Sequence, residues 1–183
     1  MTFLLSLWLP ILVTTIVLFF ASFLAWVVLP HHKPDYRRWP DEDALMRFVR
    51  ESGAAPGEYL FPLIDQKDLK EDWAKGRYDA GPWGMVNVWP AKPNMGANLL
   101  KTVLFFLVVT SLVALVAWPA LGAGAGSAEV FHIVGLTAIL AHTTGGMCRE
   151  IWFTRPLRAK LMDALDGVAF GLLTGLVFAL LWP

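Results

Sequence analysis

A histidine followed by two threonines is the first group of residues that could support chemistry. His142, Thr143 and Thr144 lie near the end of an apolar segment, where an ionisable side chain is a candidate functional site. A structural role is the alternative, in which His142 hydrogen-bonds across a helix bundle and the threonines bond back to carbonyls. Haem within one copy is not expected, because His132, ten residues from His142, faces another side of the helix. No cofactor is predicted, although a pigment or quinone contact at His142 stays open.

Two adjacent histidines and a nearby aspartate form a second group. His31 and His32 precede Asp35 in a short segment that contains proline, and imidazole and carboxylate groups are common metal ligands. Adjacent side chains on an irregular segment are expected to converge poorly, however. A polar flank at a membrane interface is therefore the favoured interpretation, and no metal ligands are predicted.

Two carboxylates near the last apolar segment have the spacing of an acid/base pair. Asp163 and Asp166 lie three residues apart at the expected start of a helix. We expect them to interact with neighbouring cations, Arg158 or Lys160, and with the positive helix end. The sequence contains no serine-hydrolase, phosphate-loop or zinc-protease motif. The chain is therefore predicted to have no catalytic residues and not to be an enzyme.

Composition and hydropathy predict a membrane protein with four spans. Hydrophobic residues make up 56% of the chain and charged residues 16%, whereas about 25% of an average soluble domain is charged. A membrane helix needs about 20 apolar residues. Four segments meet this requirement, namely residues 2–29, 99–118, 130–147 and 165–182. A basic connection over residues 148–164 precedes the last span, and its helical part is expected to begin near Thr154 and Pro156, as the N-cap and the first-turn proline. The predicted fold is an all-α integral membrane four-helix bundle.

Small residues recur at every fourth position in the last apolar segment. Gly167, Gly171, Gly175 and Ala179 therefore share one face of a helix. Small residues let another helix backbone approach closely. The pattern predicts a helix-packing face, either within the bundle or against a partner.

Basic residues and tryptophans predict one orientation. Lysine and arginine cluster after the first span and before the fourth, whereas the link between spans two and three and both chain ends lack them. Basic flanks stay in the cytoplasm, so both termini are predicted to be periplasmic. Aromatic belts mark both interfaces, with Trp8, Trp118 and Trp182 at the outer one and Trp26 and Trp152 at the inner one.

Residues 30–97 form a sizeable segment that is expected to face water. Its charges are mixed rather than basic, which argues against a nucleic-acid partner. A short helix is predicted after Pro40 and a second one around residues 67–75, with apolar strips at 59–64 and 83–89, the latter as a strand or extended strip. We expect this cytoplasmic module to cap the helix bundle, because so small a unit has little core of its own.

Four short stretches of this middle segment carry a resemblance to a known family. They resemble those of a family of small four-span bacterial inner-membrane proteins that has no assigned activity. The stretches are Pro30-His31-His32-Lys33-Pro34-Asp35-Tyr36, Pro40-Asp41-Glu42-Asp43-Ala44, Pro56-Gly57-Glu58-Tyr59-Leu60-Phe61-Pro62 and Pro93-Asn94-Met95-Gly96. The resemblance implies a multi-pass protein of the bacterial cytoplasmic membrane with an ordered middle segment, and it supplies no functional residues.

Two functions remain open at this stage. The glycine face and the aromatic middle segment favour a structural or accessory subunit of a larger membrane complex, respiratory or photosynthetic, whose partners are lipid and other membrane subunits or a second copy. The alternative is a membrane protein that binds or transports a small ligand, such as a quinone, pigment or ion, in the region of His142.

Overall fold

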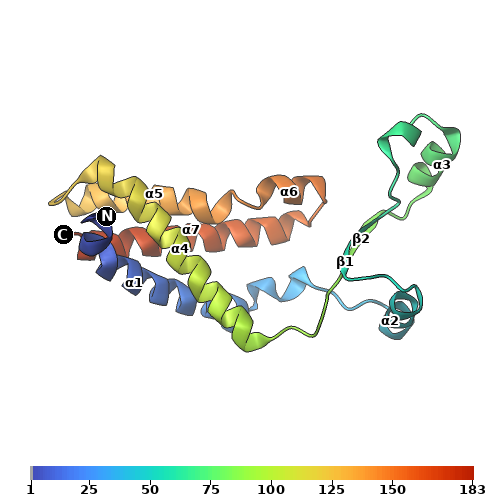
Figure 1. Cartoon of the computed structure of the whole chain (residues 1–183), viewed down its shortest axis with the longest axis horizontal. Coiled ribbons are helices and arrows are strands. Elements are labelled where there is room, and N and C mark those ends of the chain that lie inside the picture. The colour runs from blue at the N-terminus through green and yellow to red at the C-terminus, as the bar shows by residue number, and fades with distance from the viewer. Residues whose placement is uncertain (1) are drawn as a thin grey trace. The chain divides into compact units, whose positions relative to one another are not determined.

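Four long apolar helices make up most of the chain in the computed structural model, which describes residues 2–183 and the side chains from residue 5 onward. They are α1 (Thr2–Phe23), which a π-helical turn η1 (Leu24–Val28) extends, α4 (Met95–Leu121), α5 (Ser127–Thr143) and α7 (Leu157–Leu181). Within the described residues, four segments have the length and hydropathy needed to cross a membrane. Figure 1 shows that α1 starts, and α7 ends, at the same end of the bundle as the link between α4 and α5.

The predicted spans match these helices in number, but some bounds differ. The third apolar helix ends at Thr143, and a short helix α6 (Met147–Trp152) follows it. The last helix already begins at Leu157, so the connection predicted over residues 148–164 consists largely of α6 and the first turns of α7. Thr154 does not cap this helix as predicted, because it has a φ of 49° and Pro156 takes the cap position instead.

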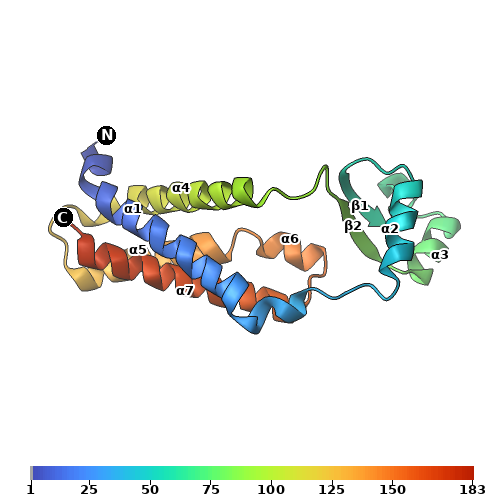
Figure 2. The same cartoon turned by 90° about the horizontal axis from the view of Figure 1, so that it is seen from below.

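The helix pair α5 and α7 packs through the predicted glycine face. Figures 1 and 2 show the two helices side by side. A Cβ atom added at Gly171 would lie 2.6 Å from the backbone nitrogen of Ile139, and one at Gly175 would lie 2.9 Å from the carbonyl oxygen of Phe131. Gly167 faces the His142 carbonyl oxygen at 3.0 Å in the same way. Only residues without a side chain allow backbones this close, so α5 occupies the face that these glycines form.

The hydrophobic core lies in the half of the bundle that contains the chain ends. It includes large side chains from α1, α4, α5 and α7, with Leu7, Val113, Val130, Val134 and Phe178 nearly inaccessible to solvent. At this end the Trp182 indole nitrogen donates a hydrogen bond to the Gly122 carbonyl oxygen over 2.9 Å. Tight packing here leaves the opposite half of the bundle to form the cavity described below.

Residues Arg38–Pro93 form a separate unit with both helices and strands. Helix α2 (Glu42–Glu51) begins at Asp41, whose carboxylate accepts a hydrogen bond from the Ala44 amide at 2.9 Å. Strands β1 (Gly57–Phe61) and β2 (Gly84–Val88) pair antiparallel, and helix α3 (Asp72–Ala80) lies between them in the sequence after a 3-10 turn, η3 (Gln66–Asp68). The all-α prediction is therefore incomplete, because the two predicted apolar strips pair as a hairpin.

This second unit buries very little. Among its described side chains only Ala74 is fully buried, while Trp73, Trp83 and Trp89 are each more than half exposed. The ring of Phe61 covers Gly84 across the hairpin, where a Cβ atom would lie 2.4 Å from the ring. A hairpin with so little core is at most marginally stable by itself, and docking of this unit onto another surface stays a prediction.

Candidate functional site

A cavity of about 850 Å³ opens between helices α1, α4, α5 and α7, in the half of the bundle that is distant from the chain ends. Ligand pockets in proteins typically measure about 300–1,000 Å³. Six of its lining residues carry aromatic rings, namely Phe19, Phe23, Trp26, Phe105, Phe106 and Phe170. Polar side chains also line it, namely Ser22 on α1, Thr102 on α4, His142 and Thr143 on α5, Glu150 on α6, and Lys160, Asp163 and Asp166 on α7. A lining that combines aromatic rings with polar groups suits an amphipathic molecule.

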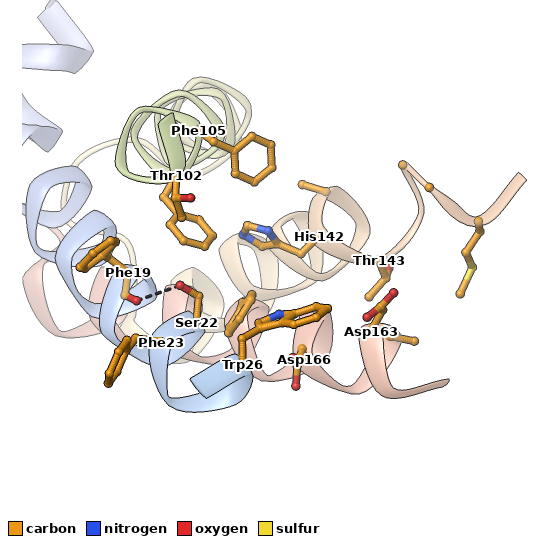
Figure 3. A pocket seen from close by; sticks show the side chains of 18 of the residues that line it. Phe19, Ser22, Phe23, Trp26, Thr102, Phe105, His142, Thr143, Asp163 and Asp166 are labelled. Atoms are coloured by element: carbon orange, nitrogen blue, oxygen red, sulfur yellow. Dashed lines mark hydrogen bonds between the residues drawn. The ribbon is translucent and has the colours of Figure 1, made fainter. Parts of the chain in front are cut away.

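His142 is the polar side chain that the aromatic walls surround. Its ring meets those of Phe106 and Phe170 edge to face, with centroids 6.0 and 5.8 Å away. Figure 3 shows the ring pointing from α5 into the space between α4 and η1. No residue in the part of the chain that the structure describes forms a hydrogen bond with either ring nitrogen. An imidazole held by two rings, with its nitrogens unused, can donate a hydrogen bond to a molecule in the cavity.

The two threonines predicted beside His142 have a structural role in this arrangement. The hydroxyl group of Thr143 donates to the Ile139 carbonyl oxygen, and that of Thr144 to the Leu140 carbonyl oxygen, each at 2.7 Å. Thr143 also lines the cavity, whereas Thr144 is exposed and does not. The predicted group therefore separates into one available side chain, His142, and two hydroxyl groups whose protons are used within their own helix.

The two carboxylates of α7 interact with partners other than the predicted ones. Asp163 accepts a hydrogen bond from Arg155, whose guanidinium group also binds Glu150 on α6 at 2.5 Å. Asp166 instead contacts both neighbouring histidines, as described next. The prediction of Arg158 or Lys160 as partners is wrong, because the connection folds back and brings Arg155 over the first turns of α7.

His31 and His32 converge on Asp166, contrary to the expectation that adjacent side chains would point apart. They lie on a 3-10 helix, η2 (Pro30–Asp35), that directly follows η1. The Nε2 atom of His31 lies 3.0 Å from Asp166 Oδ1, and the Nε2 atom of His32 lies 2.9 Å from Asp166 Oδ2. The expectation failed because the turn is regular, so both rings reach the same carboxylate.

Contacts on every side fix the ring of His32, which is only 4% exposed. It stacks on Trp26 with ring centroids 3.8 Å apart and planes 6° from parallel. Its Nδ1 atom lies 2.7 Å from Asp35 Oδ2, so carboxylates face both ring nitrogens. Burial by itself would lower the pKa of His32, but the hydrogen bonds with Asp166 and Asp35 raise it above its ordinary value.

Asp35 connects this histidine to a cation on α7. The hydrogen bond from His32 is the main reason why the pKa of Asp35 is lowered, and the charge of Arg158 acts in the same direction. Arg158 binds Asp35 through Nη1 and the His31 carbonyl oxygen through Nη2, each at 2.5 Å. The segment after α1 is thus fixed to the start of α7 by ionic and hydrogen-bonded contacts.

The predicted tryptophan anchors lie in two groups. The rings of Trp118 and Trp182 are 5.7 Å apart, at the end of the bundle that carries the core. Trp26 lies at the cavity end, and Trp8 and Trp152 are strongly exposed. The role of these tryptophans as membrane anchors, and the side of the membrane that each end faces, remain predictions.

Sequence reasoning missed the contacts of Asp166 with the histidines, which lie more than 130 positions away. The spacing of His32 and Asp35, three residues apart in a short segment that contains two prolines, could have indicated the local half of the cluster. No protein-family model, curated protein or solved structure matches this chain. The cavity and the cluster are therefore interpreted from their own chemistry.

Proposed function

We propose that this protein is a multi-pass protein of the bacterial cytoplasmic membrane that binds a small amphipathic molecule with an aromatic, carbonyl-bearing head group, such as a quinone. The observation that carries the proposal is the His142 ring, which faces a cavity of about 850 Å³ with no hydrogen-bond partner among the described residues. The ring is only partly buried, so the polar edge of a ligand or a water molecule can reach its nitrogens.

The aromatic part of the cavity suits a planar ring, whereas the charged side chains of Glu150, Lys160, Asp163 and Asp166 line its α6 and α7 side. Phe19, Phe23 and Trp26 come from the α1 side, and Phe105 and Phe106 come from α4. Aromatic side chains pack well against a flat ring, and the imidazole of His142 is placed to donate to a carbonyl oxygen at its edge. An apolar tail would extend along helix surfaces that are themselves rich in leucine, valine and phenylalanine.

In our proposal this cavity lies at the cytoplasmic side of the membrane. The connections rich in lysine and arginine flank the cavity end of the bundle, and basic flanks stay in the cytoplasm. Both termini would then be periplasmic. A ligand that reaches this depth would come from the lipid phase, as membrane quinones do, with its head group near the inner interface.

An accessory role in a larger complex is the second candidate. The sequence allows the glycine face of α7 to bind a partner protein. In the structure α5 already covers that face, so the glycines give little support to an accessory role. The exposed aromatic residues of the second unit do support it, since large apolar side chains in water favour a protein partner. Trp73, Trp83 and Trp89 are the clearest examples.

Ligand binding by the purified protein tests the proposal. The full chain in mild detergent is titrated with a benzoquinone and with a naphthoquinone, each carrying a short alkyl tail, and binding is followed by calorimetry. We expect saturable binding of one molecule per chain. Replacement His142→Ala should weaken it about tenfold, because the loss of one hydrogen bond in a water-poor site costs about 1 kcal/mol or more.

A second histidine on the same helix supplies the matched control. His132 is exposed and does not line the cavity, so His132→Ala should bind like the parent protein. Binding that is absent, or that partitions into detergent without saturation in all three proteins, rejects the quinone proposal. Stoichiometric copurification of other membrane proteins under the same mild conditions, together with absent quinone binding, would favour the accessory role.

A further inference from the structure

Two histidines and one aspartate point their ligand atoms at a common space beside the cavity. His31, His32 and Asp166 each offer one such atom, and these atoms all lie within 4.8 Å of one another. From this arrangement we propose that the three residues form a binding site for a divalent transition-metal ion, with zinc as the best match. The inference does not depend on the ligand proposed for the aromatic cavity.

Short distances separate the candidate ligand atoms of the cluster. In tetrahedral zinc sites nitrogen and oxygen ligands lie about 2.0–2.2 Å from the ion, which places neighbouring ligand atoms roughly 3.3 Å from each other. The two Nε2 atoms lie 3.0 and 2.9 Å from different oxygens of Asp166. The candidate ligand atoms all lie within 4.8 Å of one another, so they would draw closer together around an ion that replaces the two hydrogen bonds.

Outer contacts hold His32 in the orientation that a metal ligand needs. Metal-binding histidines usually donate their second ring nitrogen to a carboxylate, which fixes the tautomer and the direction of the ring. Asp35 provides this contact at 2.7 Å from His32 Nδ1, and its side chain is only 2% exposed. Arg158 holds Asp35 in turn, and Trp26 stacks on the ring. A pair of histidines on the protein surface would not need these supporting contacts.

The charges around the cluster favour an added cation. Asp35, Asp163, Asp166 and Glu150 contribute four carboxylates, whereas Arg155 and Arg158 contribute two guanidinium groups to the same network. One carboxylate oxygen, Oδ1 of Asp163, is buried without a hydrogen-bond partner among the described residues. It lies 3.9 Å from His32 Nδ1. A divalent ion would balance the excess negative charge that these groups share.

The donor set selects the class of ion. Imidazole and carboxylate ligands suit zinc and neighbouring transition metals, whereas magnesium and calcium prefer oxygen ligands throughout. Three protein ligands leave a fourth position of a tetrahedral ion for water. Because η2 supplies two ligands and α7 the third, the ion would also fasten the segment after α1 to the last helix and stabilise the bundle.

Zinc binding to the full chain tests this proposal directly. The protein carries a Strep tag rather than a polyhistidine tag, and Cys148→Ser removes the exposed thiol that could bind zinc by itself. After treatment with a chelator, the protein in mild detergent is titrated with zinc by calorimetry and with cobalt by visible absorption. We expect one zinc ion per chain, cobalt absorption bands typical of a tetrahedral site, and a higher melting temperature with zinc.

Ligand variants and a histidine control locate the ion. Asp166→Asn keeps the size of the side chain but removes its charge, and it should weaken zinc binding at least tenfold, as should His31→Ala. Asp35→Asn should weaken it about 10–100-fold through the orientation of His32. His132→Ala should bind zinc like the parent, because His132 is exposed and far along α5. Circular dichroism confirms that each variant is folded.

Two results would overturn the proposal. One is a folded parent protein that takes up no stoichiometric zinc and shows no tetrahedral cobalt spectrum, which would leave the cluster as a hydrogen-bonded clamp in which His32 carries a proton. The other is zinc binding that Asp166→Asn and His31→Ala leave unchanged, which would place the ion elsewhere in the chain.

Discussion

Gly171 on α7 lies directly against the backbone of Ile139 on α5, and there is no room between them for even a methyl group. A Cβ atom at Gly171 would approach the Ile139 nitrogen to 2.6 Å and its Cα to 2.9 Å. Backbone atoms cannot rotate away as a side chain can. The α5–α7 pair therefore depends on the absence of a side chain at this position.

Gly171→Ala is expected to destabilise the protein. The new methyl group must push α5 and α7 apart, and overpacking of this kind typically costs about 1–3 kcal/mol. SDS titration of the protein in mixed micelles measures the effect. Gly135→Ala is the matched control on the facing helix, since its Cβ would make ordinary contacts of 3.7 Å with Gly171 and Gly175. Equal stability of the two variants would contradict the packing assigned to this face.

The glycine face could be predicted from the sequence, but the helix that covers it could not. A four-residue repeat of small side chains is a local pattern, and helical geometry alone places Gly167, Gly171 and Gly175 on one face. The choice between α5, another helix or a partner depends on the shape of distant segments. The same limit applied to Asp166, whose contacts with His31 and His32 join regions that lie far apart in the chain.

The second unit shows a different limit. The sequence predicts apolar strips at 59–64 and 83–89 but not their pairing, because helical and polar residues separate them in the sequence. The register places Phe61 opposite Gly84, and the ring fills the space that a side chain at position 84 would need. Pairing of this kind depends on a fit between two segments, which periodicity within one segment does not reveal.

Cysteine labelling tests the proposed membrane orientation. The native Cys148 is exposed and lies on the basic side, so it should resist an impermeant maleimide in intact cells and react after the cells are opened. Gly126→Cys in a Cys148→Ser background should react in intact cells, because it lies in the link between α4 and α5. Position 126 has space for a side chain, with nothing within 4 Å of an added Cβ. The reverse labelling pattern would invert the topology.

Arg155 should contribute more to stability than a typical surface cation. It joins Glu150 on α6 to Asp163 on α7, and its side chain is only 29% exposed. Arg155→Met leaves two carboxylates without their cation, and we expect a loss of about 1–2 kcal/mol, again measured by SDS titration.

Arg38→Met provides the comparison for this ion pair. Arg38 lies 3.5 Å from Glu42, but the two side chains are 86% and 57% exposed, so water screens their interaction. Its replacement should change stability by less than about 0.5 kcal/mol. If the two variants are equally stable, the connection between α6 and α7 is held by something other than this ion pair.

Filling the aromatic cavity should block ligand binding without touching His142. Ala164 lines the cavity on α7, so Ala164→Leu adds bulk where the proposed quinone ring would lie. Ala169→Leu makes the same change on an exposed part of the same helix that does not line the cavity. We expect the Kd for the short-tailed quinone to rise about tenfold or more in Ala164→Leu and to stay unchanged in Ala169→Leu, because one residue excludes the ligand and the other does not.

Calorimetry in the same detergent gives both values. Equal binding by the two variants, with His142→Ala still impaired, would place the ligand outside this cavity and assign His142 an indirect effect.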